Sequence, residues 1–138
     1  MKDFEAFKLH SCFNKKAYEL GREEEVSILP VLHSWFKDNS IDFLPEGSTF
    51  DFQGENKYIE FKRRYCVSNY FSDTAIGHTK ITKANVLHSQ GHDVFFVFKF
   101  TDGVFSWKFD PNQPLRRGHI NNILHYFIPR SCLSLILL

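Results

Sequence analysis

The sequence lacks an excess of charge of either sign. Its 17 lysines and arginines against 16 aspartates and glutamates give a formal net charge of +1 at pH 7. The charge of the whole molecule therefore does not point to a nucleic-acid or acidic partner, and any such signal has to be local. Cysteine is also scarce: Cys12, Cys66 and Cys132 lie far apart with no CxxC pair, which is typical of reduced thiols rather than a disulfide framework.

Long apolar runs are missing as well. The first residues, MKDFEAFKLHSCF, carry acids early and contain no apolar stretch of the kind found in signal peptides. The apolar tail CLSLILL is too short to span a bilayer, and we expect it to pack as a terminal strand or helix end. With no repeat, low-complexity tract or linker, the chain is expected to be one domain over residues 1–138. We expect it to be soluble, intracellular and cytoplasmic; its phenylalanine- and asparagine-rich composition suits a phage- or virus-encoded protein acting in a host cell.

Phenylalanine is the most frequent aromatic residue in the sequence. The 138 residues include 16 phenylalanines and are 43% hydrophobic, enough for a substantial core. Periodicity and turn signals predict the following elements: a helix over 14–36 that Pro30 kinks or divides, strands over 48–53 and 58–64 joined by GENK, an irregular stretch over 66–76, a helix over 77–90, a buried central strand over 93–100, a strand over 104–110 and a short helix over 120–127. This order predicts an α/β (α+β) fold with a mixed central sheet flanked by helices.

The predicted strand pair in DFQGENKYIEFKRR, residues 51–64, carries charges where a buried sheet favours apolar side chains. If GENK is the loop, Gln53 pairs with Tyr58 and Asp51 lies directly across from Glu60. Lys62 then follows on the same face, because side chains in a strand alternate between faces. Two carboxylates facing each other, with Cβ atoms about 5 Å apart, destabilise a hairpin.

A divalent cation between Asp51 and Glu60 would remove that repulsion. Oxygen ligands of this kind suit Mg²⁺, with Mn²⁺ as a substitute, and these ions also bind substrate phosphates. A lysine on the same face could orient or deprotonate a water whose pKa the metal lowers. The alternative interpretation is an ordinary solvent-facing side of the sheet. The phenylalanine-rich surroundings, in which both faces of the sheet should be covered, argue against that alternative.

Asp51, followed after eight residues by Glu60-Phe61-Lys62, resembles the PD-(D/E)XK nuclease superfamily. The resemblance covers roughly residues 15–109, and Phe50 stands where the superfamily motif has proline. It implies a restriction-endonuclease-like core: a helix, a three-stranded meander, a helix and a further strand. It also implies that Asp51, Glu60 and the backbone carbonyl of Phe61 hold the metal, and that Lys62 positions the water.

Many members of the superfamily add a glutamate from the first helix, and GREEEVSILPVL offers three. Glu25 lies on the helix stripe with Leu29 and Leu32, so we expect it to face the sheet and join the catalytic and metal-binding set. Glu24 is the reserve candidate, and we expect Glu23 in solvent. The alternative is a run of acids that interacts favourably with the helix dipole.

Basic residues near the motif form the local positive signal. In the superfamily the helix after the E-x-K strand often supplies a polar or basic side chain, which favours Lys80 as a catalytic residue, with Lys83 second. Tyr58, Tyr65, Tyr70 and Phe71 are interleaved with the basic residues, a composition suited to phosphate binding. The candidate nucleic-acid-binding residues are Arg63, Arg64, Lys80, Lys83, Arg116 and Arg117. Solvated surface lysines and arginines are the alternative.

The sequence thus favours a magnesium-dependent phosphodiesterase, a deoxyribonuclease acting as an endonuclease on DNA. A homodimer would be the simple route to cutting both strands. A non-catalytic nucleic-acid-binding module on the same fold is the alternative function. A structural protein whose sheet packs against a partner is a further one.

Overall fold

The computed structural model describes residues 15–137, with side chains from residue 21 onward. Cys12 lies outside the described part of the chain. The elements are α2 (Lys15–Phe36), β1 (Asp42–Phe43), β2 (Phe52–Gly54), β3 (Lys57–Arg63), β4 (Asp73–Gly77), α3 (His78–Ser89), β5 (Asp93–Phe100), β6 (Gly103–Lys108), β7 (Arg116–Ile120), β8 (Ile123–Pro129), the 3-10 turn η2 (Arg130–Cys132) and β9 (Ser134–Leu137).

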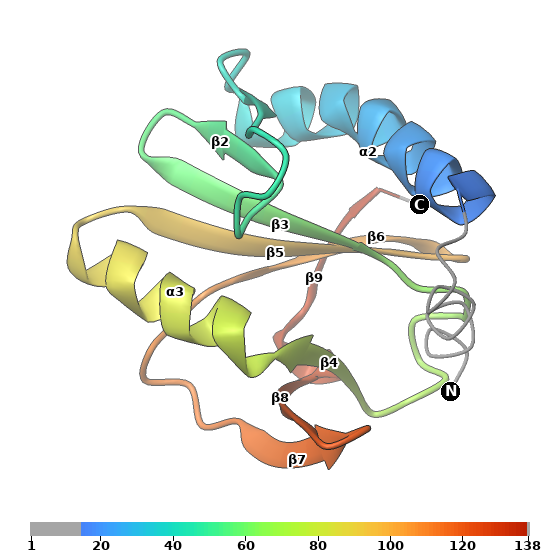
Figure 1. Cartoon of the computed structure of the whole chain (residues 1–138), viewed down its shortest axis with the longest axis vertical. Coiled ribbons are helices and arrows are strands. Elements are labelled where there is room, and N and C mark those ends of the chain that lie inside the picture. Colours follow the sequence, from blue (N-terminus) through green and yellow to red (C-terminus); the bar gives the residue numbers. More distant parts are fainter. Residues whose placement is uncertain (1–14, 138) are drawn as a thin grey trace.

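The larger sheet has the strand order β1-β2-β3-β5-β6-β9. Its strands β3 and β5 are parallel, whereas the other neighbours are antiparallel, so the sheet is mixed. The strand β5 lies inside the sheet and buries Phe96, Val97 and Phe98 completely, which confirms the central strand that its β-forming sequence predicted. A smaller sheet with the order β4-β8-β7 lies below it in Figure 1.

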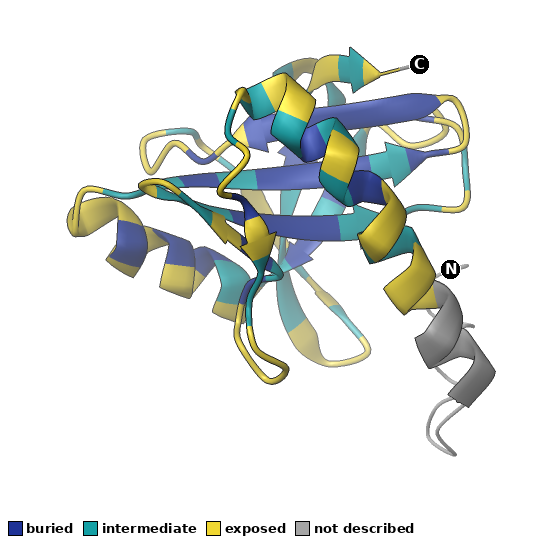
Figure 2. Ribbon diagram, turned by 90° about the horizontal axis from the view of Figure 1, so that it is seen from above, coloured by how far each residue is buried: buried dark blue, intermediate teal, exposed yellow. Residues whose placement is uncertain are grey.

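The two described helices cover opposite faces of the larger sheet (Figure 1). Helix α2 packs Ile28 and Leu32 into a cluster with Ile59 and Phe61 of β3. Helix α3 packs Ile81, Ala84 and Leu87 into a second cluster that contains most of the aromatic rings of β5 and β6. Buried residues accordingly run along the central strands and the inner sides of both helices (Figure 2). The predicted class, α+β with a mixed central sheet, is confirmed at this level.

Pro30 does not divide the first helix, which continues from Lys15 to Phe36. Proline cannot donate a backbone hydrogen bond to the carbonyl four residues earlier, here that of Val26. Both Pro30 and Val26 are exposed. Water can therefore satisfy that carbonyl, which makes the proline tolerable on this side of the helix.

The strand over 48–53 was predicted too long on its N-terminal side. Pairing of β2 begins at Phe52, and the turn consists of Glu55 and Asn56, the latter with a positive φ of 57°. Gly54, which the sequence placed in the GENK loop, is instead the last residue of β2 and pairs with Lys57. A Cβ on Gly54 would lie 2.6 Å from Ile41 Cγ1, so glycine is needed for close packing.

Phe50 does not share a face with Phe52, contrary to the alternation expected over 48–53. It lies before β2 starts and joins the α3-side cluster, 6.1 Å from the ring of Phe96, whereas Phe52 joins the α2-side cluster. The period-two rule fails here because the chain bends at Thr49–Asp51 instead of continuing as a strand.

The short helix predicted over 120–127 is wrong. Strands β7 and β8 form a hairpin there, and its turn residues Asn121 and Asn122 have φ values of 54° and 65°. Asparagine tolerates this left-handed conformation, which type I′ hairpin turns require at both positions. Strand β4 likewise lies partly within the stretch over 66–76 that was expected to be irregular.

The apolar tail forms the edge strand β9 beside β6, one of the two predicted outcomes. Within residues 15–137 there is no helix with the length and apolar character needed to cross a bilayer.

Candidate active site

Glu60 is the central feature of the site, because it is a carboxylate with an exposed fraction of only 2%. It lies in the middle of β3, between Phe61 on one side in sequence and Ile59 on the other, both of which point into the α2-side cluster. Alternation along the strand therefore turns Glu60 to the α3 side. Burial of a charged group without strong compensation is rare in cores and indicates a functional or paired residue.

The hairpin brings Asp51 close to Glu60, although the two are not paired residues of the ladder. Gln53 pairs with Tyr58 as predicted, and the paired ladder ends at Phe52 and Ile59, one residue short of Asp51 and Glu60. The Asp51 N–H donates to the Ile59 carbonyl at 3.1 Å, which holds Asp51 beside β3 where the chain bends. The Asp51 carboxylate in turn accepts a hydrogen bond from the Phe61 N–H at 2.8 Å, which fixes it at the edge where β2 ends.

Two lysines from different elements contact the Glu60 carboxylate. Lys62 Nζ lies 3.4 Å from Oε2, and Lys80 Nζ, from the first turn of α3, lies 3.3 Å from Oε1. Lys80 also donates to the carbonyl of Thr49, so it links α3 to the bend that carries Asp51. Oε1 accepts no hydrogen bond from the described groups, and the Lys80 ammonium beside it is its ion-pair partner.

Burial raises the pKa of Glu60 to about 7, from an ordinary value of 4.5. Lys62 and Lys80 oppose this rise, and the negative charge of Asp51 adds to it. Two ion pairs therefore do not fully compensate for the loss of water around this carboxylate. A residue with this combination of burial, charged neighbours and raised pKa is a functional-site candidate.

Helix α2 brings Glu25, rather than Glu24, to this site. Glu25 is half-buried, and burial followed by the charge of Asp51 raises its pKa, while Arg22 at 3.2 Å and Lys62 counteract the rise. Glu24 pairs instead with residues at the ends of β3 and β5, at 3.3 Å and 2.8 Å from Arg63 Nε and Lys99 Nζ. The side chain of Glu23 is exposed, as predicted.

A cavity of about 390 Å³ opens beside Asp51 and Glu25. The loop Leu44–Phe50 forms its opposite wall. The sequence did not single out this loop, nor the carbonyl of Thr49 that holds Lys80. Pro45 and Gly47, whose φ is 91°, are the signals in the sequence that mark the loop, but they do not reveal what lies against it.

The oxygen ligands that Asp51, Glu60 and Phe61 offer fit a hard divalent cation. The Phe61 N–H and C=O point toward β2, as those of Ile59 do, because backbone groups alternate along a strand. The Phe61 carbonyl therefore faces the same strand end as the Asp51 carboxylate, and Glu60 provides an oxygen without a hydrogen bond. Two carboxylates and a carbonyl match the way Mg²⁺ is held when waters and phosphates complete its shell. Residues 15–137 contain no group of three or more His, Cys, Asp or Glu side chains arranged around one ion position.

The remaining basic candidates lie in three places. Arg63 is directed to the α2 face, where it contacts Glu24 and donates to the carbonyls of Arg64 and Lys99. Arg64 points to the opposite face and donates to the Ala75 carbonyl at 2.7 Å. The structure thus separates these two neighbours.

Lys83 is exposed on α3, one turn after Lys80. Arg116 and Arg117 are exposed on β7, where Arg116 pairs with Asp73 at 3.0 Å. These three side chains are open to solvent on the α3 side of the molecule, but they do not contact Glu60.

A comparison of the chain with protein-family models, curated proteins and solved structures finds no match. The geometry of the described residues is therefore the basis for the function proposed below.

Proposed function

We propose that the chain is a magnesium-dependent nuclease that hydrolyses phosphodiester bonds and acts on DNA as an endonuclease. The observation that carries this proposal is the buried carboxylate of Glu60, which lies near the carboxylate of Asp51 and is contacted within 3.4 Å by two lysines from separate elements. Neighbouring carboxylates with adjacent lysines suit the binding of a divalent cation and of a phosphate group at one position.

The order of the elements supports the same proposal. Helix α2 is followed by the antiparallel strands β1, β2 and β3, then after β4 by helix α3 and the strand β5. This succession agrees with the core that the resemblance to PD-(D/E)XK nucleases implies, with β4 added. Asp51 precedes the second strand of the meander and the E-x-K residues lie on the third.

In this mechanism Asp51, Glu60 and the Phe61 carbonyl hold the cation, with Glu25 beside Asp51 as a further acid. The bound cation supplies Lewis acidity, which lowers the pKa of a water and offsets phosphate charge. Lys62, partly exposed and on the same strand face as Glu60, orients the attacking water through its ammonium group. Lys80, held by Thr49, places a positive charge where the phosphate becomes more negative.

The direct test is a cleavage assay on linear duplex, circular and single-stranded DNA with Mg²⁺, Mn²⁺ or EDTA. We expect cleavage only with metal, and a loss of roughly 10²- to 10³-fold in Lys62→Ala, the usual contribution of one fixed hydrogen-bond donor at the reacting groups. Asp51→Asn keeps an acceptor for the Phe61 N–H and should lose metal-dependent activity as well. Lys108→Ala removes an exposed lysine paired with Asp93 and is the matched control.

Cleavage at the wild-type rate by both Asp51→Asn and Lys62→Ala would disprove this mechanism. DNA binding that depends on salt, is indifferent to magnesium and yields no product would instead assign the chain to non-catalytic nucleic-acid-binding modules.

A further inference from the structure

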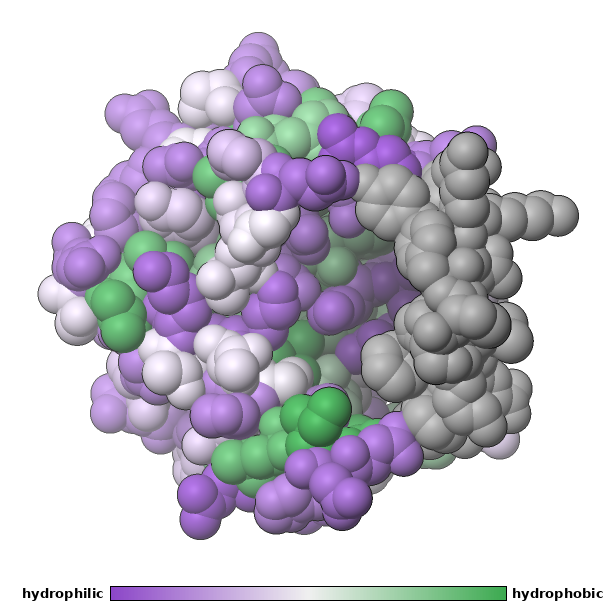
Figure 3. All heavy atoms as spheres, in the orientation of Figure 1, coloured by the Kyte–Doolittle hydropathy of each residue, from purple (hydrophilic) through white to green (hydrophobic). Residues whose placement is uncertain are grey.

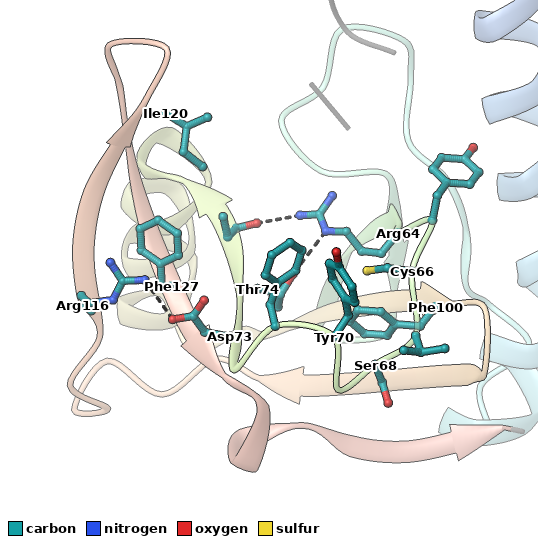
Figure 4. Close-up of a pocket in the computed structure, with 14 residues that line it drawn as sticks. Arg64, Cys66, Ser68, Tyr70, Asp73, Thr74, Phe100, Arg116, Ile120 and Phe127 are labelled. Atoms are coloured by element: carbon teal, nitrogen blue, oxygen red, sulfur yellow. Dashed lines mark hydrogen bonds and ion pairs between the residues drawn. The ribbon is translucent and has the colours of Figure 1, made fainter. Parts of the chain in front are cut away.

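A second cavity, larger than the one at Asp51, lies where β3 leaves the sheet. Its volume is about 540 Å³, within the range of sites that hold small organic groups. In Figure 4 Phe127 and Ile120 of the β7–β8 hairpin form one side, Tyr70 and Phe100 the other, and the guanidinium of Arg64 extends between them. We refer to it as the hairpin cavity. Figure 3 shows the corresponding face hollowed near its centre, with a hydrophobic patch over β7 and β8 below.

Large aromatic side chains are exposed at the rim of the hairpin cavity. Tyr65, Tyr70 and Phe71 have exposed fractions of 48%, 61% and 51%, and all three line the cavity. The rings of Tyr70 and Phe71 meet edge to face with centroids 4.7 Å apart. Three exposed aromatic residues within one short loop are an unusual surface for a protein of this size and indicate a binding site.

The loop that carries these rings is anchored, although the rings themselves are exposed. Ser68 is buried, and its N–H and hydroxyl both donate to the Asp102 carboxylate at 2.8 Å. Arg130 donates to the same hydroxyl at 3.1 Å. Because the backbone is already fixed, little ordering would be needed for a ligand to stack on the rings.

Positive charge borders the apolar walls. Arg64 crosses the cavity to Thr74 and Ala75, and Arg116 lies over the Phe127 ring at 4.0 Å. Arg64 directly follows β3, two residues after Lys62, which is about 7 Å along an extended chain. A ligand with flat apolar rings and a negatively charged backbone would therefore reach both the hairpin cavity and the Glu60 site.

We propose that the hairpin cavity binds an unstacked base of a single-stranded nucleic acid whose backbone runs past Lys62. This inference rests on the proposed function, because the Glu60 site sets the path of the nucleic-acid backbone. It names single-stranded or locally unpaired nucleic acid as the preferred class of substrate. Stacking on exposed aromatics beside a basic groove is how proteins bind single strands without strict sequence preference. Bases inside a duplex could not enter the cavity.

The test measures binding without cleavage, in EDTA, by fluorescence anisotropy. The probes are an oligothymidylate of about 12 nucleotides, a usual single-strand site size, and a duplex of the same length. We expect tighter binding of the single strand. Tyr70→Ala should weaken it about 5- to 150-fold, which corresponds to about 1–3 kcal/mol for one stacked base. Tyr70→Phe, which keeps the ring, should bind within about twofold of the wild type.

Val86→Ala shortens an exposed apolar residue on α3 and is the matched control. The salt dependence of binding should be the same in Tyr70→Ala and wild type, since no phosphate contact is lost. Equal affinity of wild type and Tyr70→Ala for the single strand, a preference for duplex, or no binding of either probe would overturn the inference. Single-strand binding that depends on Tyr70, together with no metal-dependent cleavage, would support the cavity while rejecting the nuclease proposal.

Discussion

Replacing Glu60 by Gln removes a buried negative charge while keeping the size of the side chain, and its effect on stability should depend strongly on pH. The pKa of this carboxyl rises from 4.5 to about 7 on folding, mainly through burial. Between these values the folded protein keeps a proton that the unfolded chain has released. The free energy of unfolding of the wild type therefore falls as pH rises from about 4.5 to about 7.

The size of this loss follows from the shift. The rise of the Glu60 pKa from 4.5 to about 7 lowers the free energy of unfolding by about 3 kcal/mol at a pH above both pKa values. At pH 5 the same rise lowers it by about 1 kcal/mol. Glu60→Gln has no such loss, so we expect it to be more stable than the wild type by these amounts at pH 8 and pH 5. At a pH below 4.5 the two proteins should differ little, because a protonated Glu and a Gln are nearly isosteric.

Urea unfolding in EDTA, followed by tryptophan fluorescence from pH 5 to pH 8, measures the difference. Trp107 is buried between the sheet and α3 and reports on the region of the site. Glu55→Gln, an exposed carboxylate on the β2–β3 turn, is the control and should show no gain that grows with pH. Parallel pH profiles for wild type and Glu60→Gln would refute the reasoning. Added Mg²⁺ should stabilise the wild type at pH 8 but not Glu60→Gln, because only the ionised carboxylate binds it.

The remaining predictions concern α2 and the β2–β3 hairpin. Glu25→Gln should lower metal-dependent cleavage by about 10- to 100-fold, the usual effect of residues that support a metal site. Glu24→Gln should leave cleavage unchanged and lower only the melting temperature. An equal loss of cleavage in both variants would contradict the assignment of Glu25 to the site. Gly54→Ala should destabilise the fold by about 1–3 kcal/mol in urea, because a Cβ would lie 2.6 Å from a carboxylate oxygen of Asp38. Gly21→Ala is its control, since a Cβ there meets nothing within 4 Å and alanine favours a helix.

The sequence predicted those parts of the site that depend on local pairing. The pairing of Gln53 with Tyr58 follows from the hairpin alone, because the β2–β3 connection is short, and this hairpin brings Asp51 close to Glu60. The arrival of Lys80 at Glu60 could be expected only from the family resemblance, since it requires β4 and α3 to cross over the sheet. The choice of Glu25 over Glu24 came from helical periodicity, which holds because α2 lies flat on the sheet.

Other features could not be predicted because tertiary contacts override local pattern. Phe50 looked like a strand residue, but it packs on the opposite side from Phe52 where the chain bends. The β7–β8 hairpin was mistaken for a helix, although the Asn121–Asn122 pair was an available turn signal. The hairpin cavity depends on that hairpin meeting a loop about 50 residues earlier in the chain, which no local pattern records.

The parallel pairing of β3 and β5 has a consequence for how the site forms during folding. Parallel neighbours cannot be joined by a tight turn, so β4 and α3 must cross over the sheet between them. Lys80 reaches Glu60 only when that crossover has docked, whereas the turn that joins β2 to β3 does not depend on it. Opening of α3 alone would consequently dismantle the charge cluster and leave the hairpin folded, which makes the protonation state of Glu60 a reporter of crossover docking.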